Sequence, residues 1–190
     1  MIDPKQLRKE VIRPTLKRIE LWSPAAETLL LGTALAESVI RNRQYLRQLG
    51  GGPARSIYQV EPVTAKDLRS RFLQRRSQAD LRKRILALEI PDLSIEEQLT
   101  VNLAYATAIA RLRYWSRPEP LPKANDLVGI ARYWKRHYNT HLGAGTVQGF
   151  LRKVRPFISY AAITRYQSLQ DLLAQACKRP SRRQDYPCAR

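Results

Sequence analysis

Glu37-Ser38 is followed, after a basic stretch, by GPARSIYQVEPVTA at residues 52–65, and these two segments decide the expected fold. The glycine-rich start of the second segment predicts a turn, because glycine adopts backbone conformations that other residues avoid. Residues 56–60 then read as a short extended piece, a candidate strand of a hairpin. The expected order is a helix that ends near the glutamate, a turn, an extended segment and another helix.

The helix that carries Glu37 has a clear predicted start at Ser23-Pro24, since serine caps free N–H groups and proline suits the first helical position. Apolar residues recur at helical spacing up to about Ile40, which places Glu37 on a mostly apolar face near the helix C-terminus. Burial and the negative end of a helix both favour a protonated carboxyl group. We therefore expect a raised pKa for Glu37; a glutamate that merely ends a helix is the alternative interpretation.

Further helices are predicted along the rest of the chain. A basic amphipathic helix over 3–20 is expected to bend or break at Pro14. Capping residues and apolar spacing mark the others at Thr64, at Ser77, from Ser94 to about Trp115, over 126–138, at Thr146 and from Ser168 to Ala176. The expected fold class is mainly α, with at most a small β-hairpin.

With these motifs the sequence resembles the lysozyme-like superfamily, in particular soluble lytic transglycosylases and goose-type lysozymes. Their pattern is roughly Glu-Ser followed by Gly-Ala-x-Gly-Leu-Met-Gln-x-x-Pro-x-Thr-Ala. The chain also resembles, from Ile12 to about Arg155, a group of phage-encoded proteins that pair Glu-Ser with Gln-Leu-Gly-Gly-Gly-Pro-Ala and Tyr-Asn-Thr-x-Leu-Gly-Ala-Gly-Thr. These resemblances imply a lysozyme-like helical domain that cuts the glycan strands of peptidoglycan with one essential glutamate.

The resemblance implies roles for individual residues. Glu37 is the implied catalytic acid, and Tyr138 is expected to hydrogen-bond it and fix its orientation. The implied contacts with the sugar chain come from Ser38, Tyr58, Gln59, Tyr138 and Asn139. The alternative for Tyr138 is an ordinary half-buried core tyrosine. Ser56 stands where the family has a glycine. We expect the serine side chain to narrow the substrate cleft, which puts retained activity in question.

The resemblance also favours one reaction route. A hydrolase needs a second carboxylate to handle water, and the nearest candidates in sequence are Glu61 and Asp67. Neither matches a catalytic position of the family. The expected route is therefore that of a lytic transglycosylase, in which Glu37 acts first as acid and then as base.

The net charge is +18, from 34 Lys and Arg against 16 Asp and Glu. Such an excess implies a polyanionic neighbour, which can be nucleic acid, an anionic cell envelope or an acidic protein. A dense basic run comprises Lys66, Arg69, Arg71, Arg75, Arg76, Arg82, Lys83 and Arg84. It is either a solvated helical face or a surface for a polyanion; no DNA-reading motif accompanies it, so only non-specific DNA contact is expected.

Metal and cofactor motifs are not found, and no cofactor is expected. Cys177 and Cys188 match no metal spacing and form either one terminal disulfide or two free thiols. His137 and His141 are interpreted as a solvated loop pair. Three tryptophans could stack on sugars, but core positions are the favoured interpretation for Trp22, Trp115 and Trp134.

We expect three segments: a basic N-terminal helix over 1–22, a lysozyme-like domain over 23–157, and a C-terminal helix with a basic tail over 158–190. The first residues lack the pattern of a secretory signal, and no membrane span is expected. Two function classes stay open. One is a phage-associated enzyme that cleaves peptidoglycan; the other is a non-catalytic virion component that keeps the fold and binds acidic proteins or DNA. The expected location is the phage virion, with the host cytoplasm and release to the periplasm during lysis as the alternative.

Overall fold

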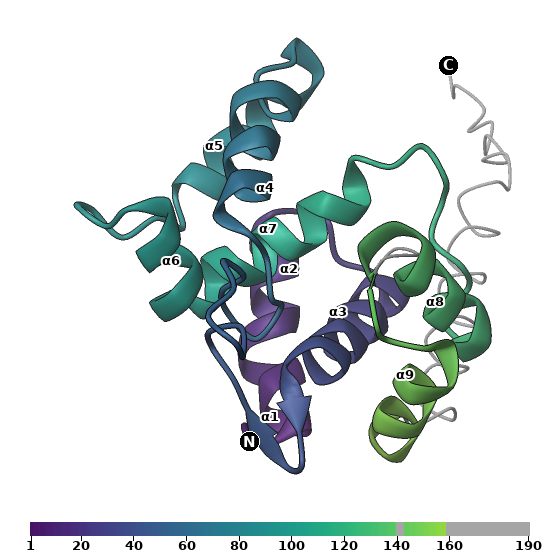
Figure 1. Cartoon of the computed structure of the whole chain (residues 1–190). Helices are drawn as coiled ribbons and strands as arrows, with labels where there is room; N and C mark the ends of the chain where they lie inside the picture. Colours follow the sequence, from purple (N-terminus) through teal and green to yellow (C-terminus); the bar gives the residue numbers. More distant parts are fainter. Residues whose placement is uncertain (140–142, 159–190) are drawn as a thin grey trace, which may run out of the picture. The chain divides into compact units, whose positions relative to one another are not determined.

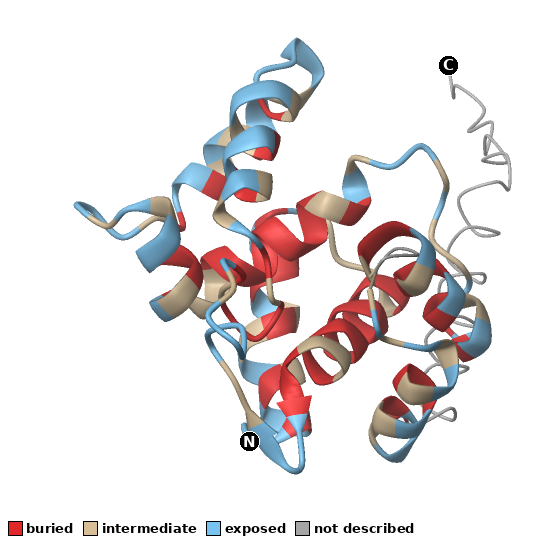
Figure 2. Cartoon of the chain, viewed as in Figure 1, coloured by how far each residue is buried: buried red, intermediate tan, exposed pale blue. Residues whose placement is uncertain are grey.

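Helix α3 (Pro24–Ser38) is the central element of the computed structural model, which describes residues 1–139 and 143–158 (Figure 1). Ser23 caps it as predicted, with its side chain accepting from the Ala26 N–H, and Pro24 takes the first position. The helix is apolar nearly all round, the pattern of a helix inside a core. It contacts α7, α8 and α9, and its residues are almost all buried (Figure 2).

The predicted mainly α class with a small hairpin is confirmed, with 62% of the described residues in helices and one two-stranded antiparallel sheet among them. Met1–Ile158 forms one compact unit. Besides α3, the helical elements are α1 (Pro4–Gln6), η1 (Leu7–Ile12), α2 (Arg13–Arg18), α4 (Pro62–Asp67), η2 (Leu68–Phe72), η3 (Arg76–Gln78), α5 (Ala79–Leu86), α6 (Ile95–Val101), α7 (Leu103–Trp115), α8 (Leu127–Trp134), η4 (Lys135–Asn139), α9 (Val147–Val154) and η5 (Arg155–Phe157).

The N-terminal helical run is continuous through α1, η1 and α2, and it widens to a π-helix just before Pro14. This widening suits a residue that has no N–H to donate to the preceding turn. The run buries an apolar face made of Leu7, Ile12, Leu16 and Ile19. It packs against α3 and α7. The predicted basic helix therefore contributes to the same core as the elements that follow it.

The hairpin lies earlier in the chain than predicted. Helix α3 ends at Ser38, and β1 (Val39–Ile40) pairs antiparallel with β2 (Arg43–Gln44). The two turn residues, Arg41 and Asn42, both have positive φ, at 47° and 62°, as a tight hairpin turn requires. The prediction of a strand over 56–60 is wrong. Residues 56–59 form a turn, which is closed by an isolated bridge between Arg55 and Val60.

Two of the predicted helix starts are also wrong. Helix α4 begins at Pro62, two residues before the expected Thr64 cap, and α5 begins without a side-chain cap from Ser77. The capping box at Ser94 is confirmed. The long helix predicted after it is broken at Asn102, whose backbone is extended and whose side chain caps α7.

Several predictions fall outside the described residues. These are the helix over 168–176, the basic tail, both cysteines (Cys177 and Cys188) and His141. Within the part of the chain that the structure describes, no helix is long and apolar enough to cross a bilayer.

Candidate functional site

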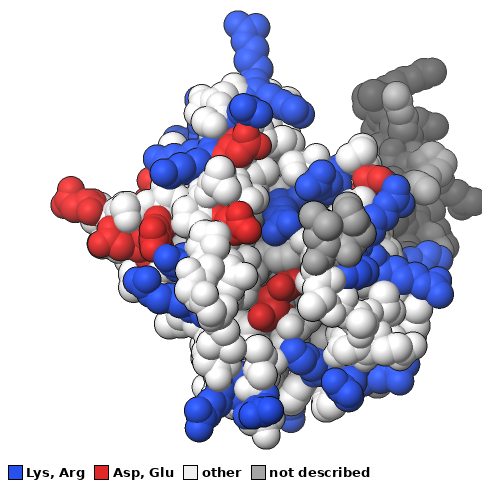
Figure 3. Space-filling view, in the orientation of Figure 1, with Lys and Arg blue, Asp and Glu red and all other residues white. Residues whose placement is uncertain are grey.

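A cavity of about 590 Å³ lies beside the C-terminal end of α3. Its volume falls within the range typical of small-molecule sites. Its lining residues are Glu37, Ser38, Ile40, Tyr45, Gln48, Leu49, Ala54, Gln59, Glu61, Thr64, Arg113, Tyr138, Asn139 and Gly143. Acidic atoms are visible near the middle of the face shown in Figure 3, bordered by uncharged residues, with Lys and Arg farther out. The hairpin, the loop after it, the start of α4, α7 and η4 thus enclose one site.

The Glu37 carboxyl group is held by two donors that come from far along the chain. The indole Nε1 of Trp134 donates to Oε1 at 2.9 Å, and Nδ2 of Asn139 donates to the same oxygen at 3.4 Å. Trp134 is itself fixed, because its ring is buried and packs on Phe150 with centroids 5.1 Å apart. The Oδ1 of Asn139 accepts from Lys135 at 2.8 Å. The orientation of the carboxyl group is therefore set by α8 and η4.

Burial raises the pKa of Glu37 above its usual range, as predicted. The hydrogen bonds from Trp134 and Asn139 and the positive charges of Arg113 and Lys153 favour the ionised form and oppose part of this effect. Because burial is the largest contribution, the net direction is upward. Glu37 thus keeps its proton to a higher pH than an exposed glutamate does.

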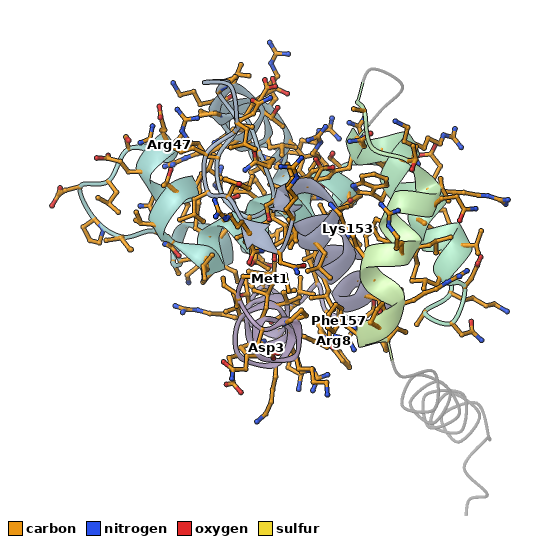
Figure 4. All side chains as sticks on the ribbon, turned by 60° about the horizontal axis from the view of Figure 1, so that its bottom comes forward. Met1, Asp3, Arg8, Arg47, Lys153 and Phe157 are labelled. Atoms are coloured by element: carbon orange, nitrogen blue, oxygen red, sulfur yellow. The ribbon has the colours of Figure 1, made fainter. Side chains whose placement is uncertain are left out.

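Lys153 closes the end of α3. Its ammonium group donates to the main-chain oxygens of Ala36 at 3.0 Å and Val39 at 2.7 Å. These carbonyls have no partner inside the helix, and a cation at a helix C-terminus also offsets the helix dipole. Figure 4 labels Lys153, which extends from α9 toward α3. Helix α9 therefore fixes the backbone on both sides of Glu37.

Tyr138 does not make the hydrogen bond expected from the resemblance. It is buried, and its hydroxyl donates to the main-chain oxygen of Tyr58 at 2.8 Å instead of to Glu37. The Arg113 guanidinium lies over its ring, 4.1 Å from the centroid, and donates to its main-chain oxygen at 2.7 Å. The prediction was wrong because the single O–H of Tyr138 is used on the Tyr58 carbonyl, and Glu37 receives its hydrogen bonds from Trp134 and Asn139. Tyr138 instead joins η4 to the turn at 56–59.

Ser38 and Gln59 both line the cavity, as expected of sugar-contacting residues, but their polar groups are largely used within the fold. The Ser38 hydroxyl donates to the main-chain oxygen of Ala34 at 2.7 Å and accepts from Gln44 at 3.2 Å. The Gln59 side chain donates to the main-chain oxygen of Ser56 at 2.7 Å. Both residues therefore shape the wall of the cavity.

Tyr58 is fully buried, is not a lining residue, and shares a hydrogen bond of 3.0 Å with Thr107. It contributes to the site through its main-chain oxygen, which accepts from Tyr138.

Ser56 has a φ of 68°, the left-handed conformation that explains why a glycine suits this place. It is buried, its hydroxyl accepts from the Tyr58 N–H at 3.1 Å, and it does not line the cavity. Ser56 therefore does not narrow the site.

The sequence interpretation missed the part that Trp134 plays. Its predicted core position is confirmed, but its N–H also reaches Glu37. The signal that could have found it is its spacing of four residues from Tyr138, which places both on one helical face. Trp115 is 45% exposed, so its predicted core position is wrong. Trp22 is half-buried and donates to Glu27 at 2.8 Å.

Among the described residues, no three His, Cys, Asp or Glu side chains form a group that could hold a metal ion. His137, expected in a solvated loop, is buried against the ring of Tyr133, with centroids 4.3 Å apart. Comparison of the chain with protein families, with curated proteins and with solved structures finds no match.

Proposed function

We propose that this protein has a lysozyme-like fold and cleaves the glycan strands of peptidoglycan, with Glu37 as general acid. The observation that carries the proposal is a carboxyl group with a raised pKa, hydrogen-bonded by Trp134 and Asn139, on the wall of a cavity of about 590 Å³. A general acid must be protonated near the working pH and within reach of the leaving group. The position of Glu37 supports both requirements.

The two hydrogen bonds define which oxygen carries the proton. Trp134 and Asn139 both donate to Oε1 of Glu37, so this oxygen acts as acceptor. In a protonated carboxyl group the single O–H donor is then placed on Oε2. We propose that this proton passes to the glycosidic oxygen as the bond to the leaving sugar breaks. The conjugate carboxylate that forms is stabilised by the same two donors and by the nearby charge of Arg113.

The experiment is release of soluble fragments from purified peptidoglycan. Glu37→Gln keeps the size of the side chain and removes the acid, and we expect a loss of at least roughly a hundredfold in rate. Glu10→Gln is the matched control, because Glu10 is exposed on η1 and pairs only with Lys9 among the described residues. Near-wild-type release by Glu37→Gln, with Glu10→Gln unchanged, would remove Glu37 from the mechanism.

The charge distribution favours a second candidate, a virion component that binds an acidic protein or DNA without catalysis. Part of the basic run is neutralised within the fold: Arg69 pairs with Glu89 at 2.6 Å and Arg84 with Glu20 at 2.7 Å. Exposed members without an ion pair to the described residues are Lys66, Arg75, Arg76 and Lys83. Blue side chains project where α4 and α5 lie (Figures 1 and 3).

We propose the phage particle as the location for either function, so that other virion proteins are partners. Binding through exposed basic side chains falls steeply with salt, because counterions compete for the same charges. Mass spectrometry of purified particles tests the location. Arg75→Glu with Arg76→Glu is expected to weaken incorporation while leaving the unfolding temperature unchanged, since both side chains are exposed.

A further inference from the structure

A second cavity, of about 240 Å³, lies where helix α7 ends and the chain continues toward α8. None of its described lining residues also lines the cavity beside Glu37. Arg113 lines the first cavity, and Arg111 lines the second. Two residues along an α-helix are separated by roughly 200° around its axis, so α7 presents these arginines on different sides. The second cavity is therefore a separate place from the candidate catalytic site.

Arg111 brings a positive charge without a carboxylate partner into this cavity. The residue is 4% exposed, and within residues 1–139 and 143–158 its guanidinium group has no ion pair. Its Nε donates to the main-chain oxygen of Leu21 at 3.3 Å, whereas its two Nη groups have no hydrogen-bond partner in that part of the chain. These two nitrogens are not sealed inside the protein, so they are open to the cavity that Arg111 lines. Buried charges are normally paired, so the free end of this guanidinium group indicates a place for an anion.

The neighbours of Arg111 do not supply that anion. The Trp115 ring centroid lies 5.2 Å from the Arg111 Cζ, and a ring face attracts a cation without replacing a carboxylate as acceptor. Glu119 is the one carboxylate among the described lining residues, and it pairs at 3.2 Å with Arg136, which does not line the cavity. Arg117 is exposed and adds a second positive charge to the lining. Burial lowers the pKa of Arg111 to about 10, so this group stays charged at neutral pH.

The walls of the cavity are aromatic and held in place. Tyr114 and Tyr133 line it with ring centroids 5.8 Å apart, and the Tyr133 hydroxyl donates to the main-chain oxygen of Glu119 at 2.9 Å. Trp115 also lines it and is 45% exposed. Arg, Trp and Tyr side chains in fixed pockets carry much of the binding energy of protein interfaces. The volume of about 240 Å³ is below the range of roughly 300–1,000 Å³ typical of small-molecule sites, so it suits a single side chain of a partner.

We propose that this cavity binds the carboxylate side chain of an Asp or Glu residue in an acidic partner protein, with Arg111 as the anchor. The two Nη groups donate parallel hydrogen bonds to the two carboxylate oxygens. Arg117 adds attraction from the exposed side, and an apolar residue beside the acid packs on Trp115. This inference rests on the proposed virion location and deepens the proposed binding of an acidic protein. It places that contact between α7 and α8, apart from the exposed basic side chains of α4 and α5.

The binding test uses N-acetyl-Phe-Glu-amide as the probe and N-acetyl-Phe-Gln-amide, which has no charge, as the matched peptide. NMR titration of the wild-type protein follows the indole N–H of Trp115. We expect the Glu peptide to bind at least about tenfold more tightly, as the gain of a charge-assisted hydrogen bond requires. Equal affinity for the two peptides, or no change at Trp115, would overturn the inference.

Two variants assign the binding to the arginines. Arg111→Met keeps the length of the side chain and removes its charge, and we expect it to lose the preference for the Glu peptide. Arg117→Glu carries the test by itself if Arg111→Met does not fold, because Arg117 is exposed. We expect Arg117→Glu to bind the Glu peptide at least about tenfold more weakly, since it places like charges together. The control is Arg132→Glu, an exposed position of α8 that does not line the cavity. Binding by Arg117→Glu as tight as by wild type would refute the assignment.

Mass spectrometry of purified particles then identifies the source of the carboxylate. A partner protein predicts that Arg117→Glu lowers incorporation several-fold relative to Arg132→Glu. Unchanged incorporation of Arg117→Glu, with peptide binding lost, would assign the cavity to a free small carboxylate; this would overturn the inference and leave the proposed location standing. Absence of the wild-type protein from particles would overturn the location, and the inference with it. Release of peptidoglycan fragments should be the same for Arg117→Glu and wild type, so a failure of the proposed catalysis is seen separately.

Discussion

Gly32→Ala in α3 is expected to destabilise the protein, because Gly32 lies against a buried aromatic ring. A Cβ added at Gly32 would overlap the ring of Phe150, a buried residue of α9, and α9 packs on α3. Phe150 in turn packs on Trp134, the donor to Glu37. Gly32→Ala therefore pushes on a chain of buried rings that ends at the candidate acid.

The magnitude follows from two opposing contributions. Alanine is favoured over glycine inside a helix by about 1 kcal/mol. Forcing an extra carbon into a packed core costs about 1–3 kcal/mol, and the upper part of that range applies because the overlap involves three atoms of a buried ring. We expect a net loss of about 1–2 kcal/mol in the free energy of unfolding, or a fall in Tm of about 2–8 °C for a chain of this size.

Urea unfolding followed by circular dichroism measures this loss. Gly149→Ala is the control, because its added Cβ would meet only the hydroxyl of Thr146, at 3.1 Å. Phe150→Leu in the Gly32→Ala background is expected to recover part of the loss, giving a coupling of at least about 0.5 kcal/mol between the two sites. A Gly32→Ala protein as stable as wild type would refute the packing argument.

Further outcomes follow from the same structure. Glu27→Ala is expected to cost about 3 kcal/mol in urea unfolding, because it leaves two arginines near the buried end of α3 without their carboxylate. Trp134→Phe removes a donor that favours the ionised form, so the pKa of Glu37 should rise further, and ¹³C NMR titration of that carboxyl group checks the direction. A carboxyl group whose pKa is raised on folding stabilises the folded state below its unfolded pKa, and this stability is lost as pH rises through the folded pKa. Because the pKa of Glu37 is raised, Glu37→Gln should be more stable than wild type above that pKa and should lose this advantage at low pH. Gly145→Ala would place a Cβ 2.6 Å from the Trp134 ring and 3.0 Å from the Asn139 amide nitrogen, the two donors to Glu37. We expect it to lower the rate of fragment release from peptidoglycan and to reduce the free energy of unfolding by about 1–3 kcal/mol.

Local signals in the sequence determined the mainly helical class, the start of α3 at Ser23-Pro24, the capping box at Ser94 and the place of Glu37 near a helix end. Each depends on contacts within a few residues, which sequence spacing records directly. The local signal failed where a neighbour decided the outcome. The helix expected to reach Ile40 stops at Ser38, because Lys153 takes the carbonyls of Ala36 and Val39 and the chain turns into a hairpin.

Only the tertiary structure decided how the site is assembled. Trp134 reaches Glu37 across 97 residues of sequence, and Asn139 across 102. No periodicity records such a distance, because the contact depends on how α8 and η4 pack beside α3. The same packing made Trp134 instead of Tyr138 the donor to Glu37, and it placed Glu61, but not Asp67, on the wall of the cavity. Residue types and spacing indicated Glu37 as the candidate acid. Long-range packing determined the direction of its pKa shift and the two donors that hold its carboxyl group.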